Sequence, residues 1–416
     1  MEKIQALKGT YDILPNESYK WQYLKKVIDE TASSFGFSEI TVPVFEYTNV
    51  FARGVGDTTD VVQKEMYTFN DKGNRSITLR PEGTSGVVRS VLEHSMLSEA
   101  LPIKLYYMLS CYRNEKPQAG RYREFRQFGV EAFGSAGPEI DAEIISLAVC
   151  FIEKLGLKNV TVNINSIGCP HCRKKYNEEL KDFLRDKPLC ETCKTRFDKN
   201  PLRILDCKEA NCKKQVKDAP ILLDYICDEC REHFESLKKN LELLGINYNV
   251  DTGIVRGLDY YTKTVFEIKS GNLGAQSTIC GGGRYDGLVE QLGGKPTPGI
   301  GFGLGLERLL LAMEAQGVEI PKKPDPDLFI CYIGEEAGNY AMKLTYELRK
   351  QGVNVSCDVM HRGLKAQMKY ANKLSAKYTV VLGDTEIDSG KAMLKNMCSG
   401  EDTEIALNEL ADKVKG

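Results

Sequence analysis

The chain has 416 residues, 42% of them hydrophobic, and a formal net charge of -2 with a pI near 6.2. This length predicts two or three domains, and the near-neutral charge excludes a generally basic nucleic-acid binder, so a nucleic acid could be held only by local patches. The start, MEKIQALKGTYDILP, lacks a signal-peptide core and no apolar run is long enough to span a membrane, so we expect a cytoplasmic protein without a membrane partner, whose 14 cysteines are reduced thiols or metal ligands.

The first predicted elements are a helix and a strand near the N-terminus. Apolar residues at helical spacing predict an amphipathic helix over residues 17–35, followed by Gly36 as a natural C-cap. A strand is expected at Glu39–Val44. Since Pro43 cannot donate to a central ladder, this strand is expected at a sheet edge, at a bulge or at a subunit boundary.

A long cationic loop is expected between two strands, Ile103–Leu109 and Phe128–Phe133, which are rich in β-favouring residues. The loop and its flanks carry five cations: Arg113, Lys116, Arg121, Arg123 and Arg126. Guanidinium groups grip phosphate oxygens in pairs, so this composition suits a polyanion. Because two acids, Glu115 and Glu124, lie in the same run, a solvated charged loop is the alternative.

The second of these strands has a polar face. Alternation places Gln127, Gly129 and Glu131 on one face and apolar side chains on the other. A carboxylate at Glu131 would be partly buried, which is costly unless it meets a ligand or a cation. A small polar ligand and a salt bridge to a nearby arginine both remain open.

Residues 165–240 are helical, charged and rich in cysteine, and they predict an inserted module. Its four cysteine pairs are Cys169 with Cys172, Cys190 with Cys193, Cys207 with Cys212, and Cys227 with Cys230. The first two pairs match the pattern of a four-cysteine zinc site, and two such sites would use all eight thiols. Structural Zn²⁺ and a metal-free insertion both remain open.

A glycine-rich strand is expected at residues 299–306, after a strand at Thr262–Ile268. Glycine alternates there with bulky apolar residues, so one face carries no side chains and a flat ligand could lie against it. Arg308 follows at the start of a helix, where it could stack on a base or reach a phosphate. Close helix packing is the alternative reason for the glycines.

The C-terminal part reads as a small α/β domain after a stiff linker, Pro321–Pro326. Its alternating strands and helices are expected at Leu328–Ile333, Tyr340–Gln351, Val353–Val359, Lys365–Lys377 and Thr379–Leu382. Cations at spacings of three or four predict one basic helix face, formed by Arg362, Lys365, Lys369, Lys373 and Lys377. This face could hold a nucleic-acid backbone or simply be solvated.

Together these motifs resemble the histidyl-tRNA synthetases of class II. The strand ending at Arg308 is similar to motif 3 of that class, the cationic hairpin to motif 2, and the first helix with its Pro43 strand to motif 1. Two further segments, RGLDYY at residues 256–261 and GGGRYD at residues 281–286, are similar to signatures peculiar to this family, and KGTYDILP at residues 8–15 and RPEGT at residues 80–84 also fit.

The resemblance covers essentially the whole chain and implies an α+β fold with a class II catalytic core, mainly an antiparallel sheet flanked by helices. It implies core segments at residues 1–165 and 241–320, a helical insertion at 166–240 and an anticodon-binding α/β domain at 327–416. A homodimer is expected, because motif 1 forms the dimer interface in that family.

The implied reaction is ATP-dependent ligation of L-histidine to tRNA(His) through histidyl-adenylate, with release of AMP and pyrophosphate and with Mg²⁺ as cofactor. Arg113 and Arg256 are the implied catalytic residues. The implied ATP-binding residues are Arg113, Glu115, Arg121, Phe125 and Arg308. The implied histidine-binding residues are Glu82, Gly83, Thr84, Arg113, Gln127, Glu131, Arg256, Tyr260, Tyr261 and Tyr285. The implied tRNA-binding residues are Gln118, Arg362, Lys365 and Lys369.

Two departures reduce the expected RNA contacts: Lys116 and Ala119 stand where the family often has arginine and lysine. A non-catalytic regulator related to the family is one alternative. Such relatives typically lack the C-terminal domain and have degraded arginines, whereas Arg113, Arg256 and Arg308 are present here. A module that senses tRNA without charging it is a second alternative.

Overall fold

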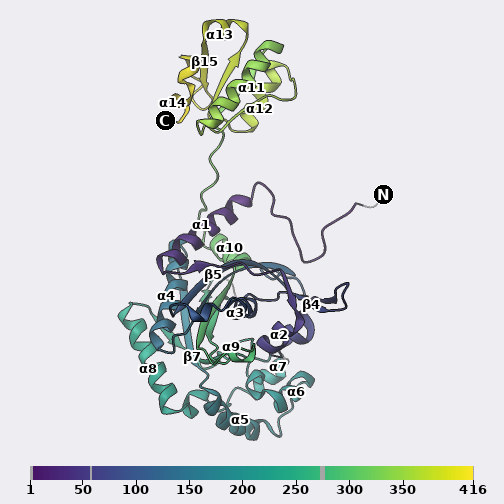
Figure 1. Cartoon of the computed structure of the whole chain (residues 1–416), viewed down its shortest axis with the longest axis vertical. Coiled ribbons are helices and arrows are strands. Elements are labelled where there is room, and N and C mark those ends of the chain that lie inside the picture. Colours follow the sequence, from purple (N-terminus) through teal and green to yellow (C-terminus); the bar gives the residue numbers. More distant parts are fainter. Residues whose placement is uncertain (1–2, 57–58, 272–276, 416) are drawn as a thin grey trace. The chain divides into compact units, whose positions relative to one another are not determined.

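The computed structural model describes residues 3–56, 59–271 and 277–415, and it divides the chain into two compact units, Met1–Pro321 and Lys322–Gly416 (Figure 1). Each unit has its own sheet and hydrophobic core. None of the helices in the described ranges is both long and apolar enough to cross a bilayer.

An eight-stranded sheet forms the centre of the first unit. In spatial order its strands are β1 (Ser38–Glu39), β5 (Ile103–Tyr112), β6 (Glu124–Phe133), β11 (Gly299–Gly305), β10 (Thr278–Arg284), β9 (Thr262–Ser270), β7 (Val160–Ser166) and β8 (Tyr248–Val250). The two outer pairs are parallel and the inner neighbours are antiparallel. The predicted hairpin is therefore confirmed as β5 and β6, with a long loop over residues 113–123.

The predicted first helix is confirmed as α1 (Ser18–Ser34), which is followed by Gly36 at φ +77°. The strand predicted at Glu39–Val44 is mostly wrong, because β1 ends at Glu39 at the edge of the large sheet. The chain next enters a separate three-stranded sheet formed by β2 (Phe45–Tyr47), β4 (Ser76–Leu79) and β3 (Thr68–Asn70). Pro43 has no N–H to donate, so it suits the segment that leaves one sheet and enters the other.

The large sheet separates two layers. One face packs on α1, α4 (Pro138–Lys154), α8 (Asp228–Leu243) and α10 (Leu306–Ala315), and the other faces α2 (Thr48–Val55), α3 (Thr84–Glu93) and α9 (Leu288–Gln291) (Figure 1). Phe128, Val130 and Phe302 are buried in the helix layer, which confirms the alternation predicted for β6 and β11. Their polar and glycine neighbours consequently face the second layer, where the site lies.

The cysteine-rich insertion is helical, as predicted. Besides α8 it contains α5 (Pro170–Leu184), α6 (Glu191–Lys199), the short helix η3 (Pro201–Ile204) and α7 (Ala210–Gln215). Figure 1 shows α5, α6 and α7 in teal, grouped at one end of the first unit. Helix α8 packs along α4, so the insertion leaves and rejoins the core beside the large sheet.

The second unit has a five-stranded sheet in the order β13 (Val355–Cys357), β12 (Leu328–Tyr332), β14 (Tyr378–Leu382), β15 (Lys391–Asn396) and β16 (Asp402–Ala406). Its helices are α11 (Glu335–Lys350), α12 (Leu364–Lys373), α13 (Asp384–Ser389) and α14 (Leu410–Lys415). The predicted alternation from β12 to β14 is confirmed. The helix predicted to reach Lys377 ends at Lys373, because Ser375 takes a left-handed conformation with φ +56°.

Candidate active site

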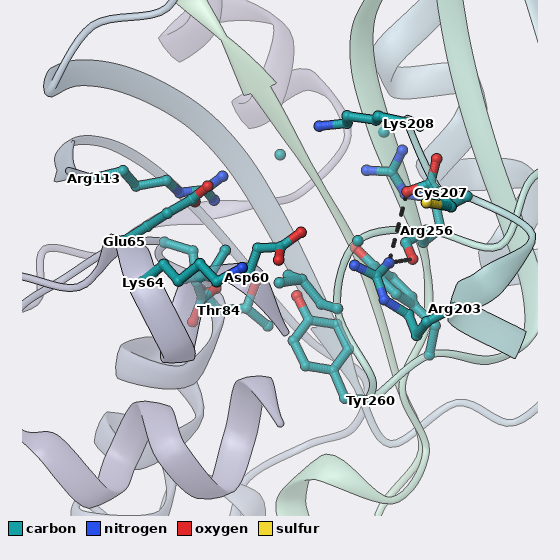
Figure 2. A pocket seen from close by; sticks show the side chains of 18 of the residues that line it. Asp60, Lys64, Glu65, Thr84, Arg113, Arg203, Cys207, Lys208, Arg256 and Tyr260 are labelled. Atoms are coloured by element: carbon teal, nitrogen blue, oxygen red, sulfur yellow. Dashed lines mark hydrogen bonds and ion pairs between the residues drawn. The ribbon is translucent and has the colours of Figure 1, made fainter. Parts of the chain in front are cut away.

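A cavity of about 390 Å³ opens over β6, β10 and β11 in the first unit (Figure 2). It brings together predicted residues that are far apart in the sequence: Glu82, Thr84, Arg113, Arg121, Gln127, Arg256, Tyr260, Tyr261, Tyr285, Gly281, Gly301 and Gly303. Figure 2 shows Arg113 and Glu65 on one side of this space and Arg203, Arg256 and Cys207 on the other. The strands supply a polar floor, and the loops supply cationic walls.

The glycines of β11 make room for polar side chains of the neighbouring strand. A Cβ atom on Gly301 would lie 2.1 Å from Oε2 of Glu131, and one on Gly303 would lie 1.9 Å from Nε2 of Gln127. Gly301 pairs directly with Glu131 in the β6–β11 register. The bare strand face predicted from the sequence therefore leaves room for two polar side chains, of which Gln127 lines the cavity and Glu131 is buried outside its lining.

Glu131 is the most deeply buried carboxylate of the floor, with 0% of its surface exposed. It accepts hydrogen bonds from the hydroxyls of Thr84 at 2.7 Å, Tyr107 at 3.1 Å and Tyr285. Burial raises the pKa of Glu131 to about 8, against the lowering effect of the bonds from Tyr285 and Thr84. Within the described residues its partners are neutral hydroxyls, so the alternative of an arginine salt bridge is wrong.

Tyr107 is a residue that sequence reasoning missed. Its ring fills the space beside two glycines, since a Cβ on Gly83 or Gly129 would lie 2.4 or 2.2 Å from its Cζ atom. The signal was the glycine at position 129, which pairs with Tyr107 across β5 and β6. A buried tyrosine needs a hydrogen-bond partner, and Glu131 supplies it.

Glu82 caps the helix that borders the floor. Its two carboxylate oxygens accept the backbone N–H groups of Thr84 at 2.6 Å and Ser85 at 2.9 Å, at the start of α3. A carboxylate is favourable at a helix N-terminus, which satisfies the free N–H groups of the first turn. Glu82 is 2% exposed and lines the cavity, so it is fixed before any ligand arrives.

The cationic loop is ordered by contacts within itself and with neighbouring segments. Arg113 donates from Nε to the carbonyl of Pro81 at 2.9 Å, and its guanidinium stands 5.4 Å from the ring centre of Phe125. Arg121 pairs with Glu115 at 2.6 Å, and Glu115 lies 3.8 Å from Arg113. These contacts contradict the alternative of a freely solvated loop, because they hold two guanidinium groups at the cavity wall.

The tip of this loop lies against the start of α10. Gly120 has φ +70°, and a Cβ there would be 3.7 Å from the Cα of Arg308. Arg308 donates to the carbonyl of Thr278 at 2.8 Å. Burial and the neighbouring Arg121 lower the pKa of Arg308, as expected where two cations are held together. Such a pair favours an anionic ligand.

Arg256 projects from the opposite wall. It adopts φ +54°, its guanidinium donates to Glu267, and it stands 5.9 Å from the ring centre of Tyr261. A Cβ on Gly281 would lie 2.3 Å from the Arg256 Nη2 atom, so the glycine makes room for the guanidinium. Tyr260 packs between the rings of Tyr261 and Tyr285, at 4.6 and 5.6 Å between centres.

The predicted RNA contacts are not among the residues that line the cavity. Gln118 is exposed at the loop tip, where its backbone pairs with that of Arg121. In the second unit, Lys365, Lys369 and Lys373 are exposed on α12.

The two ends of the predicted basic helix face are wrong. Arg362 precedes α12, pairs with Asp358 at 2.6 Å and stacks on Tyr370, with its guanidinium 4.4 Å from the ring centre. Lys377 lies beyond the helix and pairs with Asp327 at 2.8 Å.

The insertion contributes lining residues that the sequence did not reveal: Cys190, Thr192, Arg196, Arg203, Asp206, Cys207, Lys208 and Glu209. They face Asp60, Lys64 and Glu65 from the segment before β3. The charged residues of the insertion show no periodicity in the sequence that would indicate that they lie beside the strands of the large sheet. Only the fold brings the insertion to the cavity.

The cysteines form two groups of four, nested in the sequence. Cys169 and Cys172 meet Cys227 and Cys230, and the four inner cysteines, Cys190, Cys193, Cys207 and Cys212, form the second group. The predicted zinc site formed by Cys169, Cys172, Cys190 and Cys193 is therefore wrong, because these two pairs belong to different groups. Cys169 and Cys227 cap the N-termini of α5 and α8, and these two helix starts come together in the fold.

Both groups fit a zinc ion. The four ligand atoms of each group lie within 4.8 Å of one another, and all eight cysteines are free thiols. The Sγ atoms of Cys169 and Cys172 are 3.5 Å apart and those of Cys190 and Cys207 are 3.9 Å apart. Tetrahedral zinc with bonds of about 2.3 Å requires sulfur separations of about 3.8 Å.

Backbone N–H groups also stabilise the sulfurs. The N–H of Cys227 donates to Sγ of Cys172 at 3.1 Å, and the N–H of Cys190 donates to Sγ of Cys212 at 3.3 Å.

The chain is similar to known protein families, to curated proteins and to a solved structure. The family described as "Histidyl-tRNA synthetase" matches residues 9–309, and the one described as "Anticodon binding domain" matches residues 327–416. The chain is 62% identical to a histidine–tRNA ligase of Acetivibrio thermocellus and 55% identical to one of Caldanaerobacter subterraneus, with 99% of each chain covered. A crystal structure of apo S. aureus histidyl-tRNA synthetase is 41% identical over the whole of both chains, with a TM-score of 0.86.

Proposed function

Because the chain belongs to the histidyl-tRNA synthetase family, we propose how the residues of its cavity carry out the two steps of that family's reaction. The chain is an enzyme that ligates L-histidine to tRNA(His) with ATP, through histidyl-adenylate, and releases AMP and pyrophosphate. The observation that carries the proposal is one cavity lined by Arg113, Arg121, Arg256 and Gln127. The buried carboxylate of Glu131 accepts hydrogen bonds from two residues of its lining, Thr84 and Tyr285.

ATP binds on the side of the cationic loop. Arg113 holds the α-phosphate, and Arg121 and Arg308 hold the distal phosphates, with Glu115 ordering the two loop arginines. The repulsion from Arg121, which together with burial lowers the pKa of Arg308, supports this role, since phosphates bound by both guanidinium groups would offset the repulsion between like charges. Adenine stacks between Phe125 and Arg308. Mg²⁺ accompanies the phosphates, which supply oxygen ligands of the kind it prefers.

Histidine binds over the polar floor. Its α-amino group meets Glu82, Thr84 and Gln127, close to the backbone at Gly83. Glu131 and Tyr261 read the two imidazole nitrogens, because a neutral imidazole presents one donor and one acceptor. Tyr260 and Tyr285 form the walls.

Support for the histidine site comes from the hydroxyl cluster that fixes the Glu131 carboxylate. A floor ordered in this way costs little further entropy on binding.

Arg256 and Arg113 act on the reacting atoms. When the histidine carboxylate attacks the α-phosphorus, negative charge spreads over the phosphoryl oxygens, and fixed guanidinium groups stabilise it. Arg256 is partly buried, with 18% of its side chain exposed, and it contacts Glu267 and Tyr261, so its position is set before the substrates arrive. Transfer of the histidyl group to the terminal ribose of tRNA then requires mainly that the two groups be positioned together.

A test is the Arg256→Ala variant. We expect histidine-dependent exchange of pyrophosphate into ATP to fall by about a thousandfold or more, because an arginine that stabilises the charge of a phosphoryl transition state is lost. Histidine binding, measured by calorimetry, should weaken only modestly. Near-normal exchange in this variant contradicts the assigned role.

tRNA(His) meets both units in this proposal. Gln118, exposed at the tip of the cationic loop, contacts the acceptor end, and Arg362, Lys365 and Lys369 of the anticodon-binding domain contact the anticodon stem. Since Arg362 already pairs with Asp358, the two exposed lysines carry most of the electrostatic attraction. That attraction weakens as salt is raised.

A homodimer is the proposed assembly. The three-stranded sheet exposes an aromatic row, in which Tyr47 and Phe69 flank Ile77 on neighbouring strands and Phe45 lies two residues before Tyr47. Phe45, Tyr47 and Phe69 are 55%, 54% and 48% exposed. Large apolar side chains gathered in this way mark protein interfaces. The aromatic row begins at Phe45, two residues after Pro43. A subunit boundary is one of the places where Pro43 is expected, so its position also supports a dimer interface here.

Each group of four cysteines binds one structural Zn²⁺ in this proposal. The fit of the thiol positions supports it, and a value near two zinc ions per chain in purified protein is the expected result.

A cytoplasmic location is also proposed. Free thiols and a role in protein synthesis support it. The proposed domains are a catalytic core at residues 1–165 and 241–320, an insertion at residues 166–240 and a C-terminal domain at residues 327–416.

A further inference from the structure

We propose that the cysteine-rich insertion is a metal-fixed clamp on the loop Arg256–Tyr261, with Arg203 and Arg173 as its positioning residues. This inference rests on the zinc centres and on the role of Arg256 proposed above. Each arginine is tied to one group of four cysteines, and each donates to a main-chain carbonyl at one end of the loop.

Arg203 holds the first end of the loop. It lies on η3, between Cys193 and Cys207, and only 5% of it is exposed. Its Nη1 atom donates to the carbonyl of Arg256, and its Nε atom lies 4.0 Å from Oδ1 of Asp259. The inner group of cysteines therefore places a buried cation against the loop that carries the proposed catalytic arginine.

Two neighbours of Arg203 strengthen this contact. Asn200 donates to the same Asp259 oxygen at 3.0 Å. Arg196 donates to the carbonyl of Arg203 at 3.5 Å and pairs with Asp60, across the cavity, at 3.0 Å. The segment between the inner cysteines is thus tied both to the loop and to the opposite wall.

Arg173 holds the second end. It follows Cys172 directly and donates to the carbonyl of Tyr261 at 3.1 Å. Backbone hydrogen bonds add to this link, since Lys263 donates to Gly168 at 2.9 Å and Ile167 donates to Lys263 at 2.8 Å. The outer group of cysteines, which begins at Cys169, therefore borders the other end of the loop.

The loop needs such support because of its backbone. Arg256 has φ +54°, in the left-handed region that residues with a side chain rarely adopt. A conformation of this kind is unfavourable and persists only where the surroundings enforce it. A zinc ion held by each group of four cysteines would anchor the helices that carry the two arginines, α5 for Arg173 and η3 for Arg203. Metal binding in the insertion would thereby set the position of a catalytic guanidinium.

The experiment compares Arg203→Met and Arg173→Met with Arg185→Met in the full-length protein. Arg185 belongs to the same insertion but has a side chain that is 68% exposed, so it is the matched control. Zinc per chain, thermal unfolding, hydrogen exchange of residues 251–263 and 299–315, and kcat and KM for pyrophosphate exchange are measured for each variant. Arg203→Lys, which keeps one donor for the Arg256 carbonyl, tests rescue.

We expect zinc content to stay at the wild-type value in Arg203→Met and Arg173→Met, while exchange at residues 251–263 becomes faster and exchange at 299–315 does not change. The value of kcat should fall about 100-fold, as for a displacement of about 1 Å at a reacting group, and the KM for ATP should change less. Arg203→Lys should recover part of the kcat, and Arg185→Met should match the wild type. Removal of zinc with a chelator should reproduce the faster exchange of the loop.

Wild-type exchange rates and kcat in both folded arginine variants overturn the clamp. Unchanged loop exchange after zinc removal overturns its dependence on metal. Zinc near zero in the purified wild type contradicts the proposed zinc centres instead. Loss of kcat in Arg203→Met without faster loop exchange also contradicts the clamp, since it assigns the defect to the cavity wall.

Discussion

The charge of Glu131 can be tested by its effect on histidine binding. Its carboxylate has no cation among the hydrogen-bond partners described above, and burial raises its pKa to about 8. At pH 7 only about one molecule in eleven would then carry the ionised form, compared with about ten in eleven at pH 9. If the carboxylate accepts the imidazole N–H, the apparent affinity is reduced by the fraction that is competent to bind.

The expected magnitude follows from these fractions. The affinity of the wild type for histidine should rise about tenfold between pH 7 and pH 9. In Glu131→Gln the rise should disappear, and binding at pH 9 should be roughly 10- to 150-fold weaker, because a hydrogen bond to a charged group is worth about 1.5–3 kcal/mol. The amide has nearly the shape of the carboxyl group, so the floor is preserved.

Isothermal titration calorimetry of histidine at several pH values between 7 and 9 measures both effects. Glu131→Gln also serves as the control, since histidine itself titrates in the same way in both proteins. An equal pH dependence in wild type and variant would refute the assignment of the titrating group to Glu131. An equal affinity at pH 9 would refute its contact with the imidazole.

Three further predictions concern the floor, folding and assembly. Gly301→Ala places a methyl group 2.1 Å from Oε2 of Glu131 and should weaken histidine binding at least tenfold by calorimetry, whereas Gly287→Ala, with its nearest neighbour at 4.0 Å, should leave it unchanged. Because the folded pKa of Glu131 is raised from 4.5 to about 8, the folded state retains a proton that the unfolded chain releases, so thermal stability should fall as pH rises through this window, and should fall less in Glu131→Gln. A charge in the aromatic row, in Phe69→Glu, should convert the proposed dimer to monomers in sedimentation, and an unchanged sedimentation coefficient would contradict the interface.

Local periodicity predicted the parts of the fold that depend on one element at a time. The alternation at residues 127–132 assigned Phe128 and Glu131 to opposite faces because strand geometry leaves no other choice. The strand predicted through Pro43 was too long, since hydrophobicity does not report where a chain exchanges one sheet for another. The helix predicted to reach Lys377 was too long. It ends before Ser375, which takes a left-handed backbone conformation, and a serine in the sequence does not predict that conformation.

Parts of the candidate site could be predicted where the residue types themselves indicate a chemical role. Contacts that depend only on the fold could not be predicted. The arginine and glycine motifs indicated the walls and floor. The partners of Glu131 could not be read from the sequence, because Tyr107 and Tyr285 meet there only through strand pairing and a distant loop. The cysteine spacing indicated zinc ligands, but matching adjacent pairs failed, since the order in space is set by which helix starts meet.

The most direct measurement is a crystal structure of the protein with a non-hydrolysable histidyl-adenylate analogue. The account predicts the phosphate of the analogue against Arg113 and Arg256, its adenine beside Phe125 and Arg308, and its imidazole within hydrogen-bond distance of Glu131. An analogue bound outside this cavity, or with its imidazole turned away from Glu131, would contradict the account.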